Sequence, residues 1–345
     1  MSRPFGPLPP PGARPFIVEV TRGAQVESRH AVAAAILDAD GGVVASWGDV
    51  DAPVFPRSAN KAIQALPLVE SGAADAFSLS NAELALAGAS HGGEARHTET
   101  VAAWLKRIGL SADVLECGAH WPYHEETARQ LARQGGQPGN LHNNCSGKHA
   151  GMVSVARHLG EEIAGYVRPD HPVQRRVTAA IEDVCNVKLD PALTGIDGCS
   201  MPTMPLPLRK LAHGFARYIT GQGLAPERAK AAKRIAAALL AEPFYVAGTG
   251  RFCTAVMQAG AGRFIAKTGA EGVYTAASAE KGIGIALKVL DGTARAAQTA
   301  LGGLLEHVGL LDETGREAIR PLVEQPLRNW RGLDVGSISL APPAF

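Results

Sequence analysis

The 345-residue sequence has few aromatic residues, almost no net charge and no long apolar run. Phe, Trp and Tyr make up 5% of the chain, which disfavours a surface on which nucleobases stack. The 34 Lys and Arg residues nearly balance the 33 Asp and Glu residues, so the net charge of +1 creates no field that attracts nucleic acid or an anionic membrane. No stretch approaches the roughly 20 apolar residues of a membrane-spanning helix. These absences argue against nucleic-acid and membrane partners and favour a small-molecule ligand.

The N-terminal segment lacks the apolar stretch of a secretory signal, and residues 1–15 are rich in proline. We therefore expect a flexible lead over these residues and a cytoplasmic protein. Cysteine is also sparse, and the five cysteines are odd in number and far apart. They are Cys117, Cys145, Cys185, Cys199 and Cys253. In a cytoplasmic chain this pattern argues against a disulfide scaffold and leaves buried thiols, a metal site or catalysis.

Strand patterns lie towards both ends of the chain. Residues 16–21 alternate between apolar and polar as a strand does, and residues 31–47 fit two strands joined by a glycine turn. Residues 263–290 return to strand patterns, and a helix is predicted over 293–308. We therefore expect an antiparallel sheet that is assembled from both chain ends.

The middle of the chain has the apolar spacing of helices. Predicted helices cover 97–106, 149–158, 173–184, 206–218 and 226–240, and another begins near residue 56. The pattern predicts an α+β fold in which helices are inserted between the two halves of the sheet. Residues 16–345 then form one catalytic unit with two lobes. These are a sheet lobe of 16–57 plus 250–345 and a mainly helical lobe of 58–249.

The helix that begins near residue 56 carries Ser58 and Lys61 in its first turn. A spacing of three places both side chains on one face, where the amine of Lys61 can take the proton of Ser58 and make it a nucleophile. Spacing alone is weak evidence, because Ser278 and Lys281 repeat it in a predicted hairpin. The position at the start of a helix favours the first pair over the second.

A second element strengthens the Ser58–Lys61 hypothesis. Lys267 begins a Lys-Thr-Gly sequence at the end of a predicted strand. Penicillin-binding proteins and serine β-lactamases use a Ser-x-x-Lys element followed by Lys-Thr-Gly in this order. A second lysine nearby would also lower the pKa of the Lys61 amine.

Residues 88–92 match the Gly-x-Ser-x-Gly elbow of α/β-hydrolases, with Ser90 at its centre. The preceding residues 81–87 lack the β-branched side chains of a central parallel strand. The chain also lacks the alternating strand–helix units that this fold requires. We therefore interpret Ser90 as a second active-site serine, with a simple turn hydroxyl as the structural alternative.

Two polar loops carry thiols. Residues 143–149 contain Cys145 and Lys148, and residues 196–200 place Cys199 close to a carboxylate. Zinc prefers thiolate ligands, but the usual Cys-x-x-Cys and His-x-x-x-His spacings are absent. Spacing therefore leaves a zinc site and two buried free cysteines as alternatives. Glycine-rich motifs for phosphates and dinucleotides are also absent, which argues against nucleotide chemistry.

Taken together, five segments resemble the asparaginase II family, the class 3 or rhizobial-type L-asparaginases. They are Pro56–Lys61, Ala89–Glu94, His142–His149, Gly195–Ser200 and Ala266–Gly272. The resemblance implies a fold like that of serine β-lactamases, penicillin-binding proteins and β-lactamase-like glutaminases. It also implies hydrolysis of L-asparagine to L-aspartate and ammonia, and a homodimer.

The resemblance implies roles for particular residues. Two Ser–Lys pairs that face one substrate amide are implied: Ser58 with Lys61, and Ser90 with Lys267. A zinc ion (Zn²⁺) is implied as a structural or substrate-positioning element, and its ligands would be Cys145, Lys148 and Cys199 together with a water. A lysine ligand must be neutral, so bound zinc would keep its pKa low.

The mechanism that we expect is a two-step acyl transfer. Ser58 attacks the side-chain amide carbon while Lys61 takes its proton, and backbone N–H groups bind the resulting oxyanion. Ser90 and Lys267 then protonate the departing ammonia and help water to cleave the β-aspartyl ester. Residues beside the motifs are candidates to hold the α-carboxylate or α-ammonium group of the substrate: Arg57, His149 and Asp197.

Other functions stay open at this point. Other Ser–Lys acyl-transfer hydrolases fit the same motifs, above all a glutaminase, because one extra methylene changes substrate discrimination by only about 1–3 kcal/mol. A β-lactamase or a D-alanyl peptidase is disfavoured by the missing export signal. Outside enzymes, the alternative is a zinc or amino-acid sensor that uses Cys145 and Cys199. A sensor binds its ligand without turnover, whereas the enzyme releases ammonia.

Overall fold

The computed structural model describes residues 14–341, so most of the predicted flexible lead lies outside the described residues. Internal packing divides the chain into two compact units. Unit 1 comprises residues 14–59, 206–219 and 255–341, and unit 2 comprises residues 60–205 and 220–254. Both units are therefore discontinuous in sequence. The segment 206–219 belongs to unit 1, although the sequence analysis assigns it to the helical lobe.

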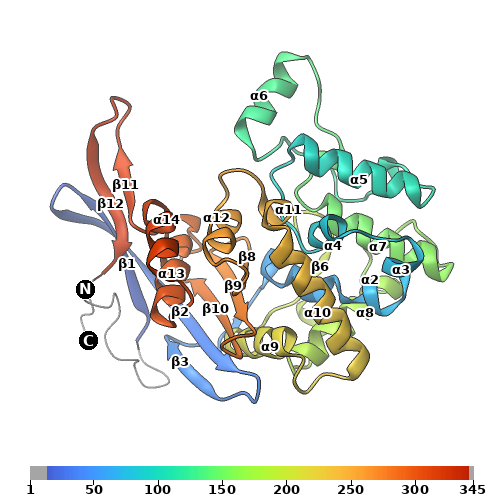
Figure 1. Ribbon diagram of the computed structural model, residues 1–345, viewed down its shortest axis with the longest axis horizontal. Helices are drawn as coiled ribbons and strands as arrows, with labels where there is room; N and C mark the ends of the chain where they lie inside the picture. The colour runs from blue at the N-terminus through green and yellow to red at the C-terminus, as the bar shows by residue number, and fades with distance from the viewer. Residues whose placement is uncertain (1–13, 342–345) are drawn as a thin grey trace. The chain divides into compact units, whose positions relative to one another are not determined.

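Unit 1 is built on an antiparallel sheet whose strands come from both ends of the chain (Figure 1). The strands are β1 (Phe16–Arg22), β2 (Gln25–Asp38), β3 (Val43–Trp47), β8 (Ile265–Thr268), β9 (Val273–Ser278), β10 (Ile283–Val289), β11 (Gln325–Arg328) and β12 (Asp334–Leu340). Their order is β11-β12-β1-β2-β10-β9-β8, and β3 pairs with β2 in addition. A separate short pair joins β4 (Pro53–Val54) to β7 (Leu206–Pro207). The predicted α+β class, with a sheet formed from both chain ends, is confirmed.

Helices bury the central strands of this sheet. Every residue of β9 and most residues of β10 are buried, because α13 (Ala294–His307) and α9 (Leu208–Thr220) pack against them. The approach of α9 depends on Gly284 in β10, since a Cβ there would collide with the backbone of Ala212 and Ala216. The strand β8 lies at one edge of this sheet. The remaining helix of unit 1 is α14 (Glu313–Val323).

Unit 2 is mainly helical. Its helices are α1 (Lys61–Gln64), α2 (Leu66–Glu70), α3 (Ala73–Ala76), α4 (Asn81–Ala87), α5 (Ala95–Arg107), α6 (Glu125–Arg133), α7 (Ser146–Leu159), α8 (Pro172–Val184), α10 (Pro226–Ala241) and α11 (Pro243–Ala247). Shorter elements are the 3-10 turns η2 (Ala112–Val114), η3 (Asn140–His142) and η4 (Pro191–Leu193) and the hairpin of β5 (Gly195–Ile196) and β6 (Pro202–Thr203). Two elements span the boundary between the units: the 3-10 turn η1 (Arg57–Asn60) and α12 (Phe252–Ala259).

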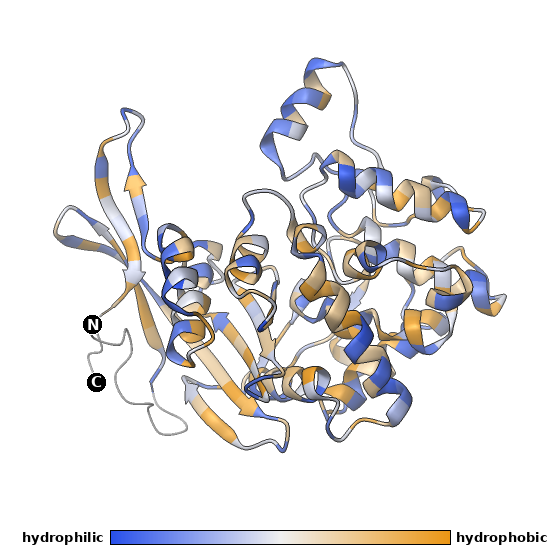
Figure 2. Cartoon of the chain, in the orientation of Figure 1, coloured by the Kyte–Doolittle hydropathy of each residue, from blue (hydrophilic) through white to orange (hydrophobic). Residues whose placement is uncertain are grey.

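The helices of unit 2 differ strongly in burial. Most of α7 is buried, and this helix begins directly after Cys145. By contrast, α6 has no buried residue and is coloured largely hydrophilic in Figure 2. The loop that carries Cys145 therefore enters the core of unit 2.

Most predicted helices are confirmed, with one exception near residue 56. The expected continuous helix is divided into η1, α1 and α2. Pro67 explains the break between α1 and α2, because proline has no N–H to donate to the carbonyl oxygen of Ile63. Residues 81–87 form the helix α4 and not a strand, which agrees with the interpretation that residues 88–92 are not a hydrolase elbow. Within residues 14–341, no helix combines the length and the apolar character that crossing a membrane demands.

Candidate active site

Lys61 lies at the start of α1 in unit 2 and is completely buried. Its Nζ atom donates hydrogen bonds to the carbonyl oxygen of Ala89 at 2.6 Å, to Ser90 Oγ at 2.9 Å and to Cys145 Sγ at 3.0 Å. Three acceptors match the three donors of a lysine ammonium group. This one nitrogen therefore connects the loop that carries Ser90 with the turn that carries Cys145.

Local sequence signals hold these two segments in place. Ser80 begins α4 with a capping box: its Oγ accepts from Glu83 N–H at 3.4 Å, and Glu83 Oε2 accepts from Ser80 N–H at 2.8 Å. Gly147, near the start of α7, permits a close approach to α4, because a Cβ there would meet the carbonyl oxygen of Leu86 at 2.5 Å. The loop after α4, which contains Ser90, and the turn before α7 are thereby brought together.

His91 joins the same two segments through a chain of hydrogen bonds. Its Nδ1 accepts from Gly93 N–H at 3.1 Å, so the ring proton lies on Nε2, which donates to Ser146 Oγ at 2.9 Å. Ser146 Oγ donates in turn to the carbonyl oxygen of Leu141 at 3.0 Å. The backbone N–H of His91 donates to the carbonyl oxygen of Asn144 at 3.1 Å. Both the ring and the backbone of His91 therefore fasten the Ser90 loop to the Cys145 turn.

The ring of His91 is held in its neutral form. Burial lowers its pKa well below the usual value, and the charges of His97 and Lys61 lower it further. A role for His91 in the site is not among the predictions from the sequence. The position of His91 between Ser90 and Gly92 is the signal that could have pointed to it.

The Cys145 turn and the tip of the β5–β6 hairpin bring two thiols and a second lysine together. Lys148 Nζ donates to Cys199 Sγ at 3.1 Å, and the side chains of Cys145 and Cys199 are hydrogen-bonded to each other. All three residues are buried. The three residues that the family resemblance implies as zinc ligands therefore form one buried cluster within unit 2.

Hydrogen bonds and charges within this cluster favour its ionised form, a thiolate beside an ammonium group. The hydrogen bond with Cys199 lowers the pKa of Cys145 well below its usual value; burial opposes this, and the charges of Lys61 and Lys148 add to it. Burial alone would lower the pKa of Lys148, but the combined attraction of Cys199 and Cys145 outweighs burial and raises it. By itself, the cluster thus holds Cys145 as a thiolate and Lys148 as an ammonium group.

The chemistry of this donor set suits zinc. Thiolate sulfur is a preferred zinc ligand, and a lysine nitrogen can bind a metal once it has lost its proton. In the part of the chain that the structure describes, no three His, Cys, Asp or Glu residues gather as metal ligands do. The cluster contains two such residues, and its third donor is a lysine. The zinc site therefore stays a prediction whose three protein donors lie together.

Ser58 and Lys267 belong to unit 1. Ser58 is half-buried in η1, the 3-10 turn that directly precedes α1. Lys267 is buried in β8, and its Nζ donates to the carbonyl oxygen of Thr268 at 2.8 Å. Lys267 thus lies on an edge strand, at the start of the Lys-Thr-Gly sequence.

Two contacts place the Ser58 segment beside the end of β8. Thr275, on the neighbouring strand β9, donates to the carbonyl oxygen of Ala59 at 2.8 Å. Gly269 ends the Lys-Thr-Gly sequence, and a Cβ there would meet the carbonyl oxygen of Pro56 at 2.7 Å. The glycine of this motif is therefore needed for the close approach of the two backbones.

These contacts group the four predicted catalytic residues by unit. Lys61 contacts Ser90 in unit 2, and the segment of Ser58 adjoins the strand of Lys267 in unit 1. The predicted pairs, Ser58 with Lys61 and Ser90 with Lys267, each join a residue of one unit to a residue of the other. Both pairings stay predictions.

A family model described as L-asparaginase II matches residues 18–340. The chain belongs to this family. As a member of the L-asparaginase II family, the protein is an asparaginase-type hydrolase that acts on a small molecule. A search of curated proteins gave no match.

The chain is also similar to two solved structures. A β-lactamase from Mycobacterium bovis is 12% identical over 85% of this chain and 95% of its own, with a TM-score of 0.38. A putative β-lactamase from Bacteroides dorei is 13% identical over 74% of this chain and 84% of its own, with a TM-score of 0.38. These similarities are too distant to bear on activity.

Among the residues expected to hold substrate in this L-asparaginase II family member, His149 is completely buried in unit 2. Its Nδ1 atom is hydrogen-bonded to the hydroxyl of Tyr166, which also accepts from Glu116 N–H at 2.9 Å. Burial lowers the pKa of His149 well below its usual value, the charges of Lys148 and Lys61 lower it further, and a hydrogen bond with the backbone of Cys199 opposes them, so the ring is neutral. His149 therefore lies beside the Cys145–Lys148–Cys199 cluster as a neutral ring.

The other two candidates lie beside strained backbone. Asp197 is half-buried in the hairpin that carries Cys199, and the following Ser200 has a φ of 68°. Arg57 is half-buried in unit 1, directly before Ser58, and has a φ of 49°. Non-glycine residues in this left-handed region cost about 1–3 kcal/mol each and are concentrated at functional sites. The roles of Arg57 and Asp197 stay predictions.

Proposed function

We propose that this protein hydrolyses L-asparagine to L-aspartate and ammonia through an acyl transfer to a serine hydroxyl. The observation that carries the proposal is the hydrogen bond between Lys61 Nζ and Ser90 Oγ, in a chain of the L-asparaginase II family. Cleavage of a primary amide needs a nucleophile and a group that moves its proton. A buried lysine beside a serine provides both groups.

The reaction then has two steps. Lys61 must first lose one of the three protons that it donates, and the resulting amine then accepts the serine proton while the hydroxyl oxygen bonds to the side-chain amide carbon of asparagine. The lysine returns this proton to the leaving nitrogen as the C–N bond breaks, and ammonia departs. Water then attacks the β-aspartyl ester, which releases aspartate and the serine.

Two serines are candidates for the nucleophile. The family resemblance favours Ser58, three residues before Lys61 in the chain, whereas the hydrogen bond at 2.9 Å favours Ser90. The serine that is not the nucleophile would pass protons, together with Lys267. His149 would help to orient the substrate, because its neutral ring is buried beside Cys199.

We also propose that Cys145, Lys148 and Cys199 hold a zinc ion. The support is the burial of all three residues, their mutual hydrogen bonds and the soft sulfur donors. A bound zinc ion would supply positive charge beside the reacting groups and fix the two loops that carry its ligands. Lys148 would bind through its neutral amine, so metal uptake would release a proton from this residue.

The proposed mechanism can be tested by trapping the acyl-enzyme. Wild-type protein, Ser58→Ala and Ser90→Ala are each mixed with L-asparagine, quenched in acid within milliseconds to seconds and measured as intact proteins by mass spectrometry. We expect a mass increase of one aspartyl group in the wild type, located by peptide mapping on one of the two serines. The alanine variant at that serine should lack the adduct. Ammonia release with no adduct at any quench time, and with full activity in both variants, would refute the serine mechanism.

We further propose that the enzyme is a cytoplasmic homodimer, as the sequence analysis and the family resemblance predict. Light scattering on the purified protein tests the oligomeric state. A mass of one chain, about 36 kDa, across the concentration range would contradict the dimer.

A further inference from the structure

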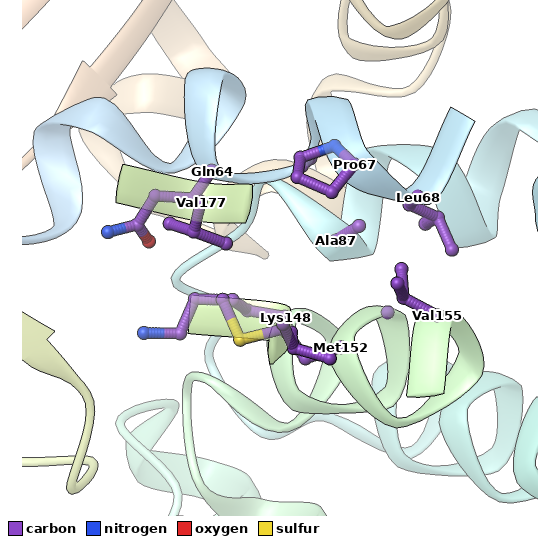
Figure 3. A pocket seen from close by; sticks show the side chains of 11 residues that line it. Gln64, Pro67, Leu68, Ala87, Lys148, Met152, Val155 and Val177 are labelled. Carbon is purple, nitrogen blue, oxygen red and sulfur yellow. The ribbon is translucent and has the colours of Figure 1, made fainter. Parts of the chain in front are cut away.

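Cys145 and Lys148 are held in place by different parts of unit 2. Lys148 lies in the first turn of α7, and its stem lines a mainly apolar pocket together with Met152 and Val177. Figure 3 shows the amine of Lys148 pointing away from Val155, another residue of that pocket. Cys145 is the N-cap residue that precedes the helix. Helix packing therefore places Lys148, whereas the position of the Cys145 sulfur depends on the turn before α7.

The side chain of Asn143 supports this turn. It is only 3% exposed. Its Oδ1 atom accepts from Cys145 N–H at 2.9 Å. Its Nδ2 atom donates to the carbonyl oxygens of Cys117 at 2.9 Å and Gly118 at 3.1 Å. A backbone N–H can only donate and a backbone carbonyl can only accept, so these three bonds determine which end of the amide is the nitrogen. Both N–H groups and the oxygen of the Asn143 amide are therefore engaged.

The segment that receives the Asn143 amide is shaped for it. Cys117 and Gly118 direct successive carbonyl oxygens to one nitrogen atom. Gly118 has a φ of 73°, in the left-handed region that glycine adopts without strain. An aspartate of the same shape would place an oxygen against these two carbonyl oxygens. The pattern therefore selects an amide, which ties Cys145 to the segment 117–118.

The contacts of the Cys145 sulfur show what this support controls. Its Sγ atom accepts from Lys61 Nζ at 3.0 Å and is hydrogen-bonded to the side chain of Cys199. A displaced turn would carry the sulfur away from both groups. When a group that orients a metal ligand is removed, metal affinity typically falls about 10–100-fold, although the group does not touch the metal.

We propose that Asn143 is a positioning residue whose buried amide holds the Cys145 sulfur where it binds zinc together with Lys148 and Cys199. This inference rests on the proposed function, in which these three residues hold a zinc ion, and it adds the residue that orients one of them. Asn143 acts through Cys145 and not through the metal.

Asn140 provides a matched control. It is half-buried in η3, and its Nδ2 atom donates to the carbonyl oxygens of Ala112 at 3.2 Å and Leu115 at 2.9 Å. Both asparagines thus fasten the segment 112–118 through two N–H groups, and Asn143 in addition accepts from Cys145 N–H. The variants Asn140→Leu and Asn143→Leu both weaken the anchoring of this segment. Only Asn143→Leu removes the acceptor of Cys145 N–H.

The test measures zinc affinity without any substrate. Zinc-containing protein is titrated with a chromophoric chelator, and urea denaturation in excess chelator gives the stability of each chain without metal. Asn143→Leu should hold zinc about 10–100-fold more weakly than the wild type, and Asn140→Leu within about threefold of it. Both variants should be less stable than the wild type, because each loses two hydrogen bonds to backbone carbonyls.

A milder variant covers the case in which Asn143→Leu does not fold. Asn143→Ser keeps an acceptor for Cys145 N–H, because a serine hydroxyl can accept from the N–H two residues on. This shorter side chain no longer reaches the carbonyl oxygens of Cys117 and Gly118, so the acceptor is not anchored. Zinc affinity should therefore fall about threefold to tenfold in Asn143→Ser.

Three results would overturn the proposal. They are wild-type protein that binds no zinc, wild-type zinc affinity in the Asn143 variants, and an equal loss of affinity in Asn143→Leu and Asn140→Leu. The last result would make the amide a structural anchor of the segment 112–118 only. The proposed function fails separately: if asparagine yields no ammonia but zinc affinity depends on Asn143, the positioning role stands and the reaction does not.

Discussion

Replacing Lys61 by Met separates catalysis from stability. The methionine side chain has a similar length but no amine, so the proposed general base is removed. A positioned general acid–base group typically contributes about 10²–10⁴-fold to a rate. We therefore expect kcat for L-asparagine to fall by at least about 10²-fold in Lys61→Met, with a smaller change in KM.

The effect on stability should be small, because two contributions oppose each other. Ala89 O, Ser90 Oγ and Cys145 Sγ each lose a hydrogen bond from Lys61, and a buried acceptor that stays unpaired costs about 1–3 kcal/mol. In return, the variant no longer buries an ammonium group, whose desolvation costs several kcal/mol. We expect a free energy of unfolding within about 2 kcal/mol of the wild-type value, measured by urea denaturation.

Lys288 provides a matched control for this substitution. Its Nζ donates to the carbonyl oxygens of Glu271 and Val289, both at 2.6 Å, and no serine takes part. Lys288→Met should keep the wild-type rate. A Lys61→Met variant that folds and keeps more than a tenth of the wild-type kcat would refute the assignment of Lys61 as the base.

Three further predictions concern pH, metal and the sheet. Burial lowers the pKa of His91 and His97 below the usual value of 6.5. Below that pH the unfolded chain therefore binds more protons than the folded chain, so the free energy of unfolding falls as the pH is lowered. The midpoint of urea denaturation should be lower at about pH 5 than at about pH 7.5, and equal midpoints would contradict this prediction. The zinc proposal predicts about one zinc ion per chain by elemental analysis and much less in Cys199→Ser; equal zinc content in both proteins would refute it. In unit 1, Nδ1 of the buried His30 lies 2.5 Å from Asp291 Oδ2. His30→Ala should therefore lower the free energy of unfolding by about 1–3 kcal/mol and leave kcat unchanged. A stable but inactive His30→Ala variant would contradict this purely structural role.

The fold was predictable where apolar periodicity is uninterrupted. The strands near both chain ends and helices such as α5, α7, α8 and α13 follow their sequence patterns closely. Prolines explain two departures. Pro67 divides the helix expected after residue 56, and Pro321 lies inside α14, a segment for which no helix is predicted. The strands β11 and β12 were also missed; β11 includes Pro326, which sequence rules disfavour in a strand.

The candidate site was predictable as a set of residues but not as a set of contacts. The motif residues Ser90, Cys145 and Cys199 do lie around lysines in one buried region. The contact between Lys61 and Ser90 was not predicted, because it joins segments 29 residues apart and depends on how closely α4 and α7 pack. The role of His91 depends in the same way on the distant Ser146. Sequence spacing indicates which residues share one face of a helix, whereas tertiary packing determines which loops come into contact.

The most direct test of the central claim is ammonia release from L-asparagine by the purified, zinc-quantified protein, with L-glutamine in parallel and Lys61→Met as the inactive reference. We predict ammonia release from asparagine that is lost in the variant and is faster than release from glutamine. Release mainly from glutamine would make the protein a glutaminase of the same mechanism. Hydrolysis of neither amide by folded, zinc-containing protein would contradict the enzymatic account and would favour an amino-acid or zinc sensor.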